Sequence, residues 1–224
     1  MPAGPEFLRE LIRPLELERV AGAFGRILPH STDDALTART VLSAPEASAQ
    51  ERCLPELSSA EIWKLPGDQR VEHLRFNNVA SAVRADVFRA TEFPVVPFGE
   101  DLAWAARAIE AGWRVRYAPL SLVYHAHRYN ASQAFERYRL DAAFHREIHS
   151  HLLRPSLSSA LKGFLYEMGQ DLRFVSSSKG FGWGDLWRSP GLRGAQVLGQ
   201  FWGSRGWGKD FWPLVDQSAG ASSR

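Results

Sequence analysis

The stretch from Phe76 to His127, FNNVASAVRADVFRATEFPVVPFGEDLAWAARAIEAGWRVRYAPLSLVYHAH, decides the fold and carries most of the chemistry. It contains an Asn- and Ser-rich turn, the acidic pair Glu100-Asp101 at a predicted helix start, and a His-Ala-His at the end of a predicted strand. Sites are usually built from polar groups at the ends of apolar elements, because a rigid scaffold then holds them in place. We therefore expect the functional site in this stretch.

The same stretch predicts a helix followed by strands. Residues 102–111 favour a helix that ends at Gly112, with an apolar face formed by Leu102, Ala105, Ala106 and Ile109. Apolar residues alternate with arginines over residues 113–117, which predicts a strand that ends at Pro119. Residues 122–127 form a further extended piece, and residues 85–90 a short helix.

The flanking sequence indicates an α/β class with extra C-terminal helices. A short helix after Pro5 precedes a buried strand at residues 20–28, in which Gly22 and Gly25 allow another backbone or a ligand to approach closely. Residues 29–67 predict a long irregular surface excursion, with a short helix over residues 33–42 capped by Ser31 or Thr32.

Two longer helices are expected after the central stretch. Asn130 and Gln133 form a capping-box pattern for a helix that continues to Leu153, and a second helix runs over residues 156–173 with an apolar stripe. The members of that stripe are Leu161, Leu165 and Met168. We assign residues 1–154 to one domain and 155–224 to a helical, Trp- and Gly-rich extension.

Composition narrows the class of protein. The chain has 224 residues, 45% of them hydrophobic, which is enough to bury a core. Its 27 basic and 25 acidic residues are spread without a block of like charge, so nucleic acid is not expected as a partner. The single Cys53 cannot form an internal disulfide, and we find neither a leader pattern nor a run of ~20 apolar residues. These features predict a cytoplasmic protein.

The acidic pair has two interpretations. Glu100 and Asp101 can stabilise a helix start through the helix dipole alone, which contributes ~0.3 to 1 kcal/mol. Alternatively, one carboxylate is a general base, held rigidly behind Gly99.

The histidines also leave alternatives open. His125 and His127 lie two apart on an extended segment and would point to one face, where neutral imidazoles bind a divalent metal or a phosphate; a packed or surface role is the alternative. The segment from His145 to His149, HREIH, differs from the zinc-peptidase pattern H-E-x-x-H because Glu147 does not follow the first histidine directly. We expect these two histidines to lie on a helix surface.

Five of the eight tryptophans lie after residue 155 among glycines and basic residues, namely Trp183, Trp187, Trp202, Trp207 and Trp212. Such a tail is typical either of a small packing module or of a surface that rests on a membrane. The second alternative arises because Trp is favoured where one side of its ring contacts apolar groups and the other contacts water. The sequence does not choose between the two.

An ordered series of motifs resembles the acceptor half of family 2 glycosyltransferases, with bacterial rhamnosyltransferases the most similar. The series is Asn77-Asn78-x-x-Ser81-Ala82-x-Arg84, Phe98-Gly99-Glu100-Asp101-Leu102, Glu110-Ala111-Gly112, Tyr117-x-Pro119 and Val123-Tyr124-His125-x-His127-x-Tyr129. The segment from Val20 to Pro29 is similar to one that these enzymes carry upstream, although Ile27 stands where Gln is usual. The resemblance covers about residues 4 to 150.

The resemblance implies the C-terminal portion of a GT-A fold and inverting transfer of a sugar, such as rhamnose, from a nucleotide-diphospho-sugar to a hydroxyl of a glycan or lipid-linked acceptor. It makes Asp101 the base and Glu100 its supporting neighbour. It also implies that Asn77, Asn78, Ser81 and Arg84 contact substrate. His125, with His127 beside it, would help to hold Mg or Mn on the donor diphosphate.

The chain departs from the family pattern at its start. Family members carry a nucleotide-binding half ending in an acidic motif, and Met1 falls just after the place where that motif is expected. The sequence thus predicts an enzyme that requires a nucleotide-binding half, in a longer chain or as a partner. The alternatives are a non-catalytic module that binds a glycan, a membrane surface or a partner, and a metal-dependent hydrolase that uses the histidines.

Overall fold

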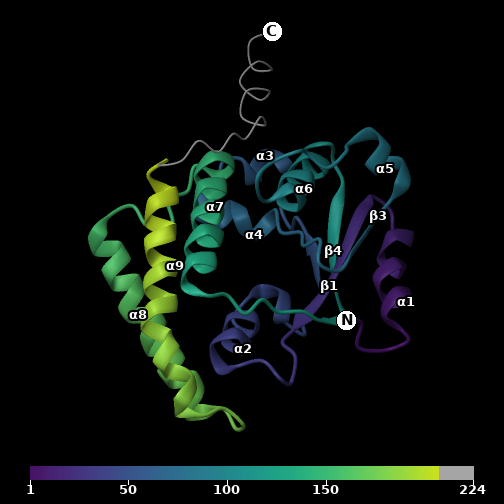
Figure 1. Ribbon diagram of the computed structural model, residues 1–224. Helices are drawn as coiled ribbons and strands as arrows, with labels where there is room; N and C mark the ends of the chain where they lie inside the picture. Colours follow the sequence, from purple (N-terminus) through teal and green to yellow (C-terminus); the bar gives the residue numbers. More distant parts are fainter. Residues whose placement is uncertain (207–224) are drawn as a thin grey trace. The chain divides into compact units, whose positions relative to one another are not determined.

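The computed structural model describes residues 1–206 and falls into two compact units. The first unit comprises residues 1–30, 41–95 and 99–126, and the second comprises residues 31–40, 96–98 and 127 onward. The sequence-based division after residue 154 stays a prediction. Strands occur in the first unit and long helices in the second (Figure 1).

The first unit is built on a four-stranded mixed sheet with the order β2-β4-β1-β3. The central strands β1 and β4 are parallel, and the edge strands β2 and β3 pair with them in antiparallel fashion. The strands are β1 (Val20–Leu28), β2 (Arg52–Leu54), β3 (Ser81–Val83) and β4 (Arg114–Tyr124). With the helices described below, this confirms the α/β class.

Strand β1 forms where expected, and its first six residues are all buried. Gly25 permits a close approach of β4, because a Cβ atom there would lie 2.4 Å from the backbone oxygen of Ser121. Gly22 makes room for the rings of Trp104 and Phe76, at 2.9 and 3.0 Å from the same hypothetical atom. The close approach predicted from these glycines is confirmed.

Strand β4 corrects the expectation that Pro119 ends a strand. Residues 114–124 form one strand, and its pairing with β1 jumps from Ala118 to Leu122. The intervening residues form a bulge, where proline is tolerated because no ladder hydrogen bond requires its missing N–H. Pro119 therefore marks an irregularity within a single strand.

The helices of the first unit surround the sheet (Figure 1). They are α1 (Phe7–Ile12), α3 (Ser59–Ile62), α4 (Gly67–His73), α5 (Ala85–Ala90) and α6 (Glu100–Glu110). The core includes aromatic side chains from β1, β4, α6 and the residue before the Asn turn, namely Phe24, Tyr117, Trp104 and Phe76, packed with aliphatic residues. Gly112 follows the C-terminal end of α6 and adopts φ +85°, as its sequence position predicts.

The segment 29–67 is more ordered than predicted. It supplies the edge strand β2, and the hydroxyl of Tyr117 lies 2.8 Å from the carbonyl oxygen of Glu46 and 2.6 Å from that of Ser48. It also supplies the helix α2 (Ala35–Leu42), whose first five residues are buried. The cap of α2 is neither Ser31 nor Thr32, because the Thr37 N–H donates to the Asp34 carboxylate at 3.0 Å.

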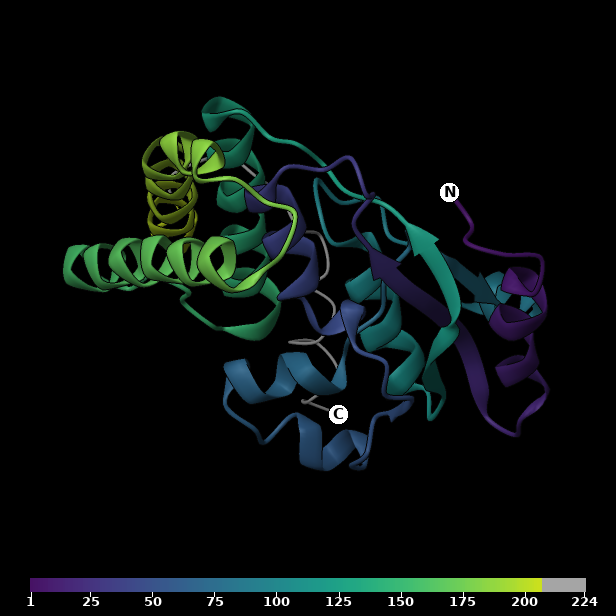
Figure 2. The same ribbon diagram turned by 90° about the horizontal axis from the view of Figure 1, so that it is seen from below.

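The second unit is helical, with α7 (Ala131–His149), α8 (Leu157–Ser177) and α9 (Ser189–Ser204). Helices α7 and α9 run side by side, and α8 crosses α9, which is seen nearly end-on in Figure 2. Capping boxes at Asn130 and Ser156 begin α7 and α8, and the first of these was predicted. Helix α7 ends four residues before the predicted Leu153, with Ser150 at φ +54°.

Glycines of the Trp- and Gly-rich region bring α9 close to α7. A Cβ atom at Gly203 would lie 2.1 Å from the Arg139 carbonyl oxygen, and one at Gly199 would lie 2.4 Å from that of Phe135. Within this region, helix α9 is therefore packed closely on α7. Trp207 and Trp212 lie outside the described residues, and no helix within residues 1–206 has the length and apolar character needed to cross a bilayer.

Candidate functional site

Asp101 lies in the first turn of α6, two residues after a glycine whose backbone is left-handed. Gly99 adopts φ +78°, ψ +28°, a conformation that residues with a side chain rarely take. The turn brings the chain into α6 so that the acidic pair occupies the first two helical positions. The positive end of the helix dipole there favours ionised carboxylates.

Both oxygens of the Asp101 carboxylate accept backbone hydrogen bonds. The Asn78 N–H donates to one at 3.1 Å, and the Leu102 N–H donates to the other at 2.8 Å. Burial raises the pKa of Asp101 above its ordinary value of 3.8, the two N–H donors lower it in part, and the negative charge of Glu100 raises it further. Asp101 is thus oriented by the Asn turn and shifted toward protonation.

The turn from Asn77 to Ser81 is fixed by its own side chains. The Val79 N–H donates to the Asn77 side-chain oxygen at 2.8 Å, and the Ser81 hydroxyl donates to the Asn78 side-chain oxygen at 2.7 Å. Asn78 is exposed and Asn77 and Ser81 are half-buried, so their polar atoms border solvent. The structure therefore brings Asn77, Asn78 and Ser81 together with Asp101.

Aromatic packing below the turn holds it against α6. Phe76, directly before the turn, packs with its ring centroid 4.9 Å from that of Trp104, three residues after Asp101. The Trp104 indole N–H donates to the Thr91 carbonyl oxygen at 2.8 Å. Sequence reasoning did not assign a role to either aromatic residue, although their positions next to the polar motifs are the signal that points to them.

His125 lies just past the end of β4, and its N–H donates to the Leu28 carbonyl oxygen at 3.0 Å. The Asn turn is near the same end of the sheet, because the Gly25 N–H donates to the Ala80 carbonyl and Ala80 packs with Ile27 and Val123. The carboxyl end of parallel strands is the usual location of ligand sites in α/β sheets.

His127 is not on a strand, which corrects the expectation that both histidines share a strand face. Strand β4 ends at Tyr124, and His127 belongs to the second unit, where its ring stacks on Tyr129 with centroids 5.6 Å apart. The alternation of side chains assumed for residues 123–127 therefore does not extend to this histidine.

Arg84 faces a different part of the first unit. Its guanidinium is held by the Asp86 carboxylate, with nitrogen to oxygen distances of 3.1 and 2.8 Å, and lies over the Trp113 ring. Arg84, Trp113 and Arg19 line a hollow of about 400 Å³ at the C-terminal end of α6. Trp113 and Arg19, but not Arg84, also line a neighbouring hollow of about 570 Å³. Asp101 is at the opposite end of the same helix, roughly 15 Å away along its axis.

The HREIH segment packs inside the second unit. His149 is 1% exposed and contacts the ring of Phe144, while His145 is half-buried with its Nε2 3.7 Å from Asp141. The expectation of two surface histidines is wrong for His149, because α7 turns this side chain inward.

No metal centre is formed by residues 1–206: these contain no group of three His, Cys, Asp or Glu side chains that could hold an ion. A divalent ion bound at His125 would accordingly need ligands from elsewhere.

Two curated proteins match part of this chain. It is 28% identical over 145 residues to the O-antigen chain rhamnosyltransferase RfbN of Salmonella typhimurium, covering 64% of this chain and 43% of that protein. It is 30% identical over 142 residues to the O-antigen chain rhamnosyltransferase WbaN of Salmonella anatum, covering 62% of this chain and 42% of that protein.

The chain is distantly similar to bacterial O-antigen rhamnosyltransferases. It spans less than half the length of these two rhamnosyltransferases. No family model and no solved structure matches it.

Proposed function

We propose that this chain is the acceptor-side part of an inverting glycosyltransferase of the GT-A type, in which Asp101 deprotonates the acceptor hydroxyl. The observation that carries the proposal is the Asp101 carboxylate, held by two backbone N–H groups beside an exposed polar turn. The distant similarity to O-antigen rhamnosyltransferases supports rhamnose as the sugar and an O-antigen glycan, free or lipid-linked, as the acceptor.

The contacts of Asp101 suit a general base. Each carboxylate oxygen receives one backbone N–H and keeps a further lone pair, so a substrate hydroxyl can donate to it without displacing the protein contacts. The raised pKa brings the group closer to the operating pH, which improves a base that must accept a proton in the transition state. Two fixed hydrogen bonds also keep the carboxylate from rotating away.

The neighbours of Asp101 have supporting roles in this proposal. Asn78 and Ser81 present side chains at the edge of the turn, where they would position the acceptor and the donor sugar through hydrogen bonds. Glu100 would support acceptor placement and keep the pKa of Asp101 raised. Arg84 lies at the other end of α6, so a direct role at this site requires a substrate long enough to reach it.

The donor side of the reaction requires groups that we assign to a nucleotide-binding half, joined to this chain or supplied by a partner. His125 has no set of companion ligands within residues 1–206, so the described residues do not by themselves fit a divalent metal. Mg or Mn would neutralise charge on the leaving diphosphate when bound. His125 remains our candidate ligand on this chain.

Exchange of Asp101 tests the proposal. In sugar transfer by this chain combined with the nucleotide-binding half, Asp101→Asn should lower kcat by about 10²- to 10⁴-fold, the usual contribution of a general base. Asp68→Asn is the matched control, because Asp68 is likewise the second residue of a helix but is exposed on α4. Equal activity of the Asp101 variant and the control would refute the role of Asp101.

The second candidate is a non-catalytic module that binds the acceptor glycan. It is favoured for the chain by itself, because residues 1–206 lack a metal-ligand group and the chain matches less than half of its relatives. Calorimetric titration of the 224-residue chain with a nucleoside-diphosphate sugar and Mg²⁺ distinguishes the two. Metal-dependent binding would reject this candidate, and glycan binding without nucleotide binding would support it.

A further inference from the structure

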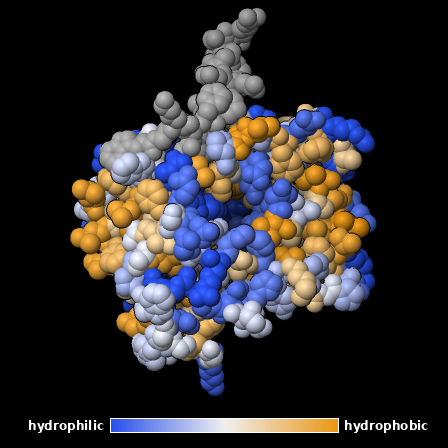
Figure 3. All heavy atoms as spheres, viewed as in Figure 1, coloured by the Kyte–Doolittle hydropathy of each residue, from blue (hydrophilic) through white to orange (hydrophobic). Residues whose placement is uncertain are grey.

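Helix α8 carries an apolar stripe on its solvent side. Leu157, Leu161, Leu165 and Leu172 are between 49% and 69% exposed. At 100° per residue they fall within an arc of about 80°, along roughly 22 Å of helix. Figure 3 shows hydrophobic side chains gathered at the left edge of the view, where Figure 1 draws α8.

The exposed charges beside this stripe are all positive. Lys162 and Arg173 lie about 60 to 80° around the helix from Leu165, and Lys179 follows in the loop after α8. All three are exposed, and within residues 1–206 none of them forms an ion pair. The leucine stripe and its cationic border form what we call the α8 face.

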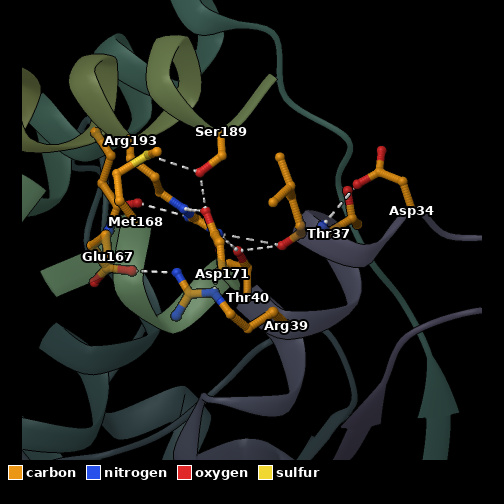
Figure 4. A network of polar contacts seen from close by, with 11 residues as sticks. Asp34, Thr37, Arg39, Thr40, Glu167, Met168, Asp171, Ser189 and Arg193 are labelled. Carbon is orange, nitrogen blue, oxygen red and sulfur yellow. Dashed lines mark hydrogen bonds and ion pairs between the residues drawn. The ribbon is translucent and has the colours of Figure 1, made fainter. Parts of the chain in front are cut away.

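The acidic residues of the same region are engaged inside the unit. Asp171 is fully buried, where the guanidinium of Arg193 donates to it at 2.9 Å, and Glu167 pairs with Arg39 (Figure 4). Asp185, the third acid between residues 157 and 204, accepts the Ala35 N–H at 3.2 Å. The outward field of the α8 face is therefore positive.

Tryptophans next to α8 add to the apolar surface. Trp183 and Trp187 lie in the 3₁₀ turn Trp183–Arg188 that follows α8, and they are 64% and 79% exposed. The turn is joined to the end of α8 by the packing of Phe181 on Phe174, with ring centroids 5.3 Å apart. Tryptophan is favoured at the boundary between hydrocarbon and water because its ring is apolar and its N–H is polar.

We propose that the α8 face docks on an anionic phospholipid surface. An apolar stripe with lysine and arginine at its border is the pattern of a helix that lies in the plane of a membrane, where leucines enter the acyl boundary and cations meet lipid phosphates. The charge decides between this occupant and a second copy of the chain. A symmetric pairing of two α8 faces would bring Lys162 and Arg173 of both copies together, and their repulsion opposes such a dimer.

This inference is independent of the proposed function, because it uses no residue of the first unit. It also places the membrane contact considered for the Trp- and Gly-rich extension on one helix of that extension and the turn after it, outside the proposed catalytic region. A sugar transfer assay and a vesicle assay can therefore fail separately.

Co-sedimentation of the full chain with vesicles tests the proposal. We expect binding to vesicles of phosphatidylcholine and phosphatidylglycerol (3:1) and at least tenfold weaker binding to phosphatidylcholine alone. The double variant Leu161→Ser/Leu165→Ser should bind at least tenfold more weakly. The control Leu8→Ser/Leu120→Ser changes leucines that are equally exposed, at 64% and 68%, but lie in the first unit, and its binding should not change.

A charge variant gives a second, separate test. Lys162→Glu/Arg173→Glu should lower affinity for the anionic vesicles by about 30-fold or more, from the usual contribution of one cation near such a surface. Lys64→Glu/Arg89→Glu is the matched control, since both of its cations are exposed in the first unit. Unchanged thermal unfolding of each variant shows that the fold is retained.

Three outcomes would overturn the proposal. The first is no vesicle binding by the unaltered chain. The second is binding that persists in both α8 variants, which would place the lipid contact elsewhere. The third is a concentration-dependent dimer in sedimentation velocity that the leucine variant abolishes while vesicle binding is absent, which would make the α8 face an interface between copies.

Discussion

The environment of Asp101 predicts a pH dependence of stability with an unusual sign. Its pKa in the fold is raised by burial above the ordinary 3.8, so the folded chain holds this proton more tightly than the unfolded chain. The contribution of Asp101 to the free energy of unfolding must then fall as pH rises from about 3.8 through the raised value. At neutral pH the buried, ionised carboxylate of Asp101 therefore destabilises the folded chain.

Removing the titrating group isolates this effect. In Asp101→Asn, one of the two backbone N–H donors loses its acceptor oxygen, which lowers the free energy of unfolding by about 1 kcal/mol at every pH. The asparagine side chain does not titrate, so this cost does not change with pH. The stability of the variant relative to the unaltered chain should therefore improve between pH 4 and pH 7, as measured by urea unfolding. A relative stability that declines over this interval would contradict the raised pKa.

The local arrangement of the candidate site residues could be predicted from sequence where the chain itself fixes it. Asp101 follows a glycine at a helix start, and Asn78 lies in a turn that its own side chains close, so both depend on local geometry. Arg84 could not be predicted in the same way. Its direction depends on the ion pair with Asp86 and on Trp113, which is brought beside it only by the pairing of strands.

Two glycines of α9 make opposite predictions for the same substitution. A Cβ atom at Gly203 would meet the Arg139 carbonyl oxygen at 2.1 Å, whereas one at Gly191 meets nothing within 4 Å. Gly203→Ala should destabilise the second unit by about 1 to 3 kcal/mol, because α9 must move away from α7. Gly191→Ala should stabilise it by up to about 1 kcal/mol, because alanine is the better helix former.

Thermal unfolding followed by circular dichroism measures both variants. The Gly191 variant is the control for helix propensity, since both glycines lie in α9. If the two variants unfold at the same temperature, the tight contact between α7 and α9 at Gly203 is not present in solution.

Whole helices and strands could be predicted where their apolar runs, caps or periodic faces are continuous in sequence. β1, α6 and α7 have continuous apolar runs, caps or periodic faces, and they form close to their predicted bounds. Strand β4 was predicted as two pieces because a proline is a local signal, while the bulge that accommodates it depends on pairing with β1. The edge strand β2 has only three residues, too few for a periodic pattern.

The arrangement of the chain into two units was not predictable from local patterns. Residues 31–40 lie early in the sequence, yet they belong with the helices of the C-terminal part. Their attachment depends on Arg39, which pairs with Asp171 and Glu167, more than 120 positions away. No periodicity or spacing in a single sequence indicates which buried arginine meets which acid.

The same network gives a stability prediction opposite in sign to that of Asp101. Burial alone would raise the pKa of Asp171, but hydrogen bonds from Arg193 and Ser189 and the charges of Arg193 and Arg39 outweigh it and hold the pKa below 3.8. A carboxylate whose pKa is lowered by folding stabilises the folded chain above about pH 3.8. This stabilisation is lost as pH falls through the pKa of the folded state. Asp171→Asn leaves the buried Arg193 without its counter-charge and should cost about 3 to 5 kcal/mol near pH 7.

The cost of Asp171→Asn should shrink as the pH falls below 4, because the unaltered chain then loses the same interaction by protonation. Urea unfolding of both chains at pH 7 and at pH 3.5 measures the difference, and Asp68→Asn, on the exposed first turn of α4, controls for the loss of a carboxylate. A cost equal at the two pH values would mean that Asp171 does not carry the charge that joins residues 31–40 to α8 and α9. From pH 4 to 7 only the Asp101→Asn variant should gain stability relative to the unaltered chain, whereas the cost of Asp171→Asn should change mainly below pH 4, because the two pKa values are shifted in opposite directions.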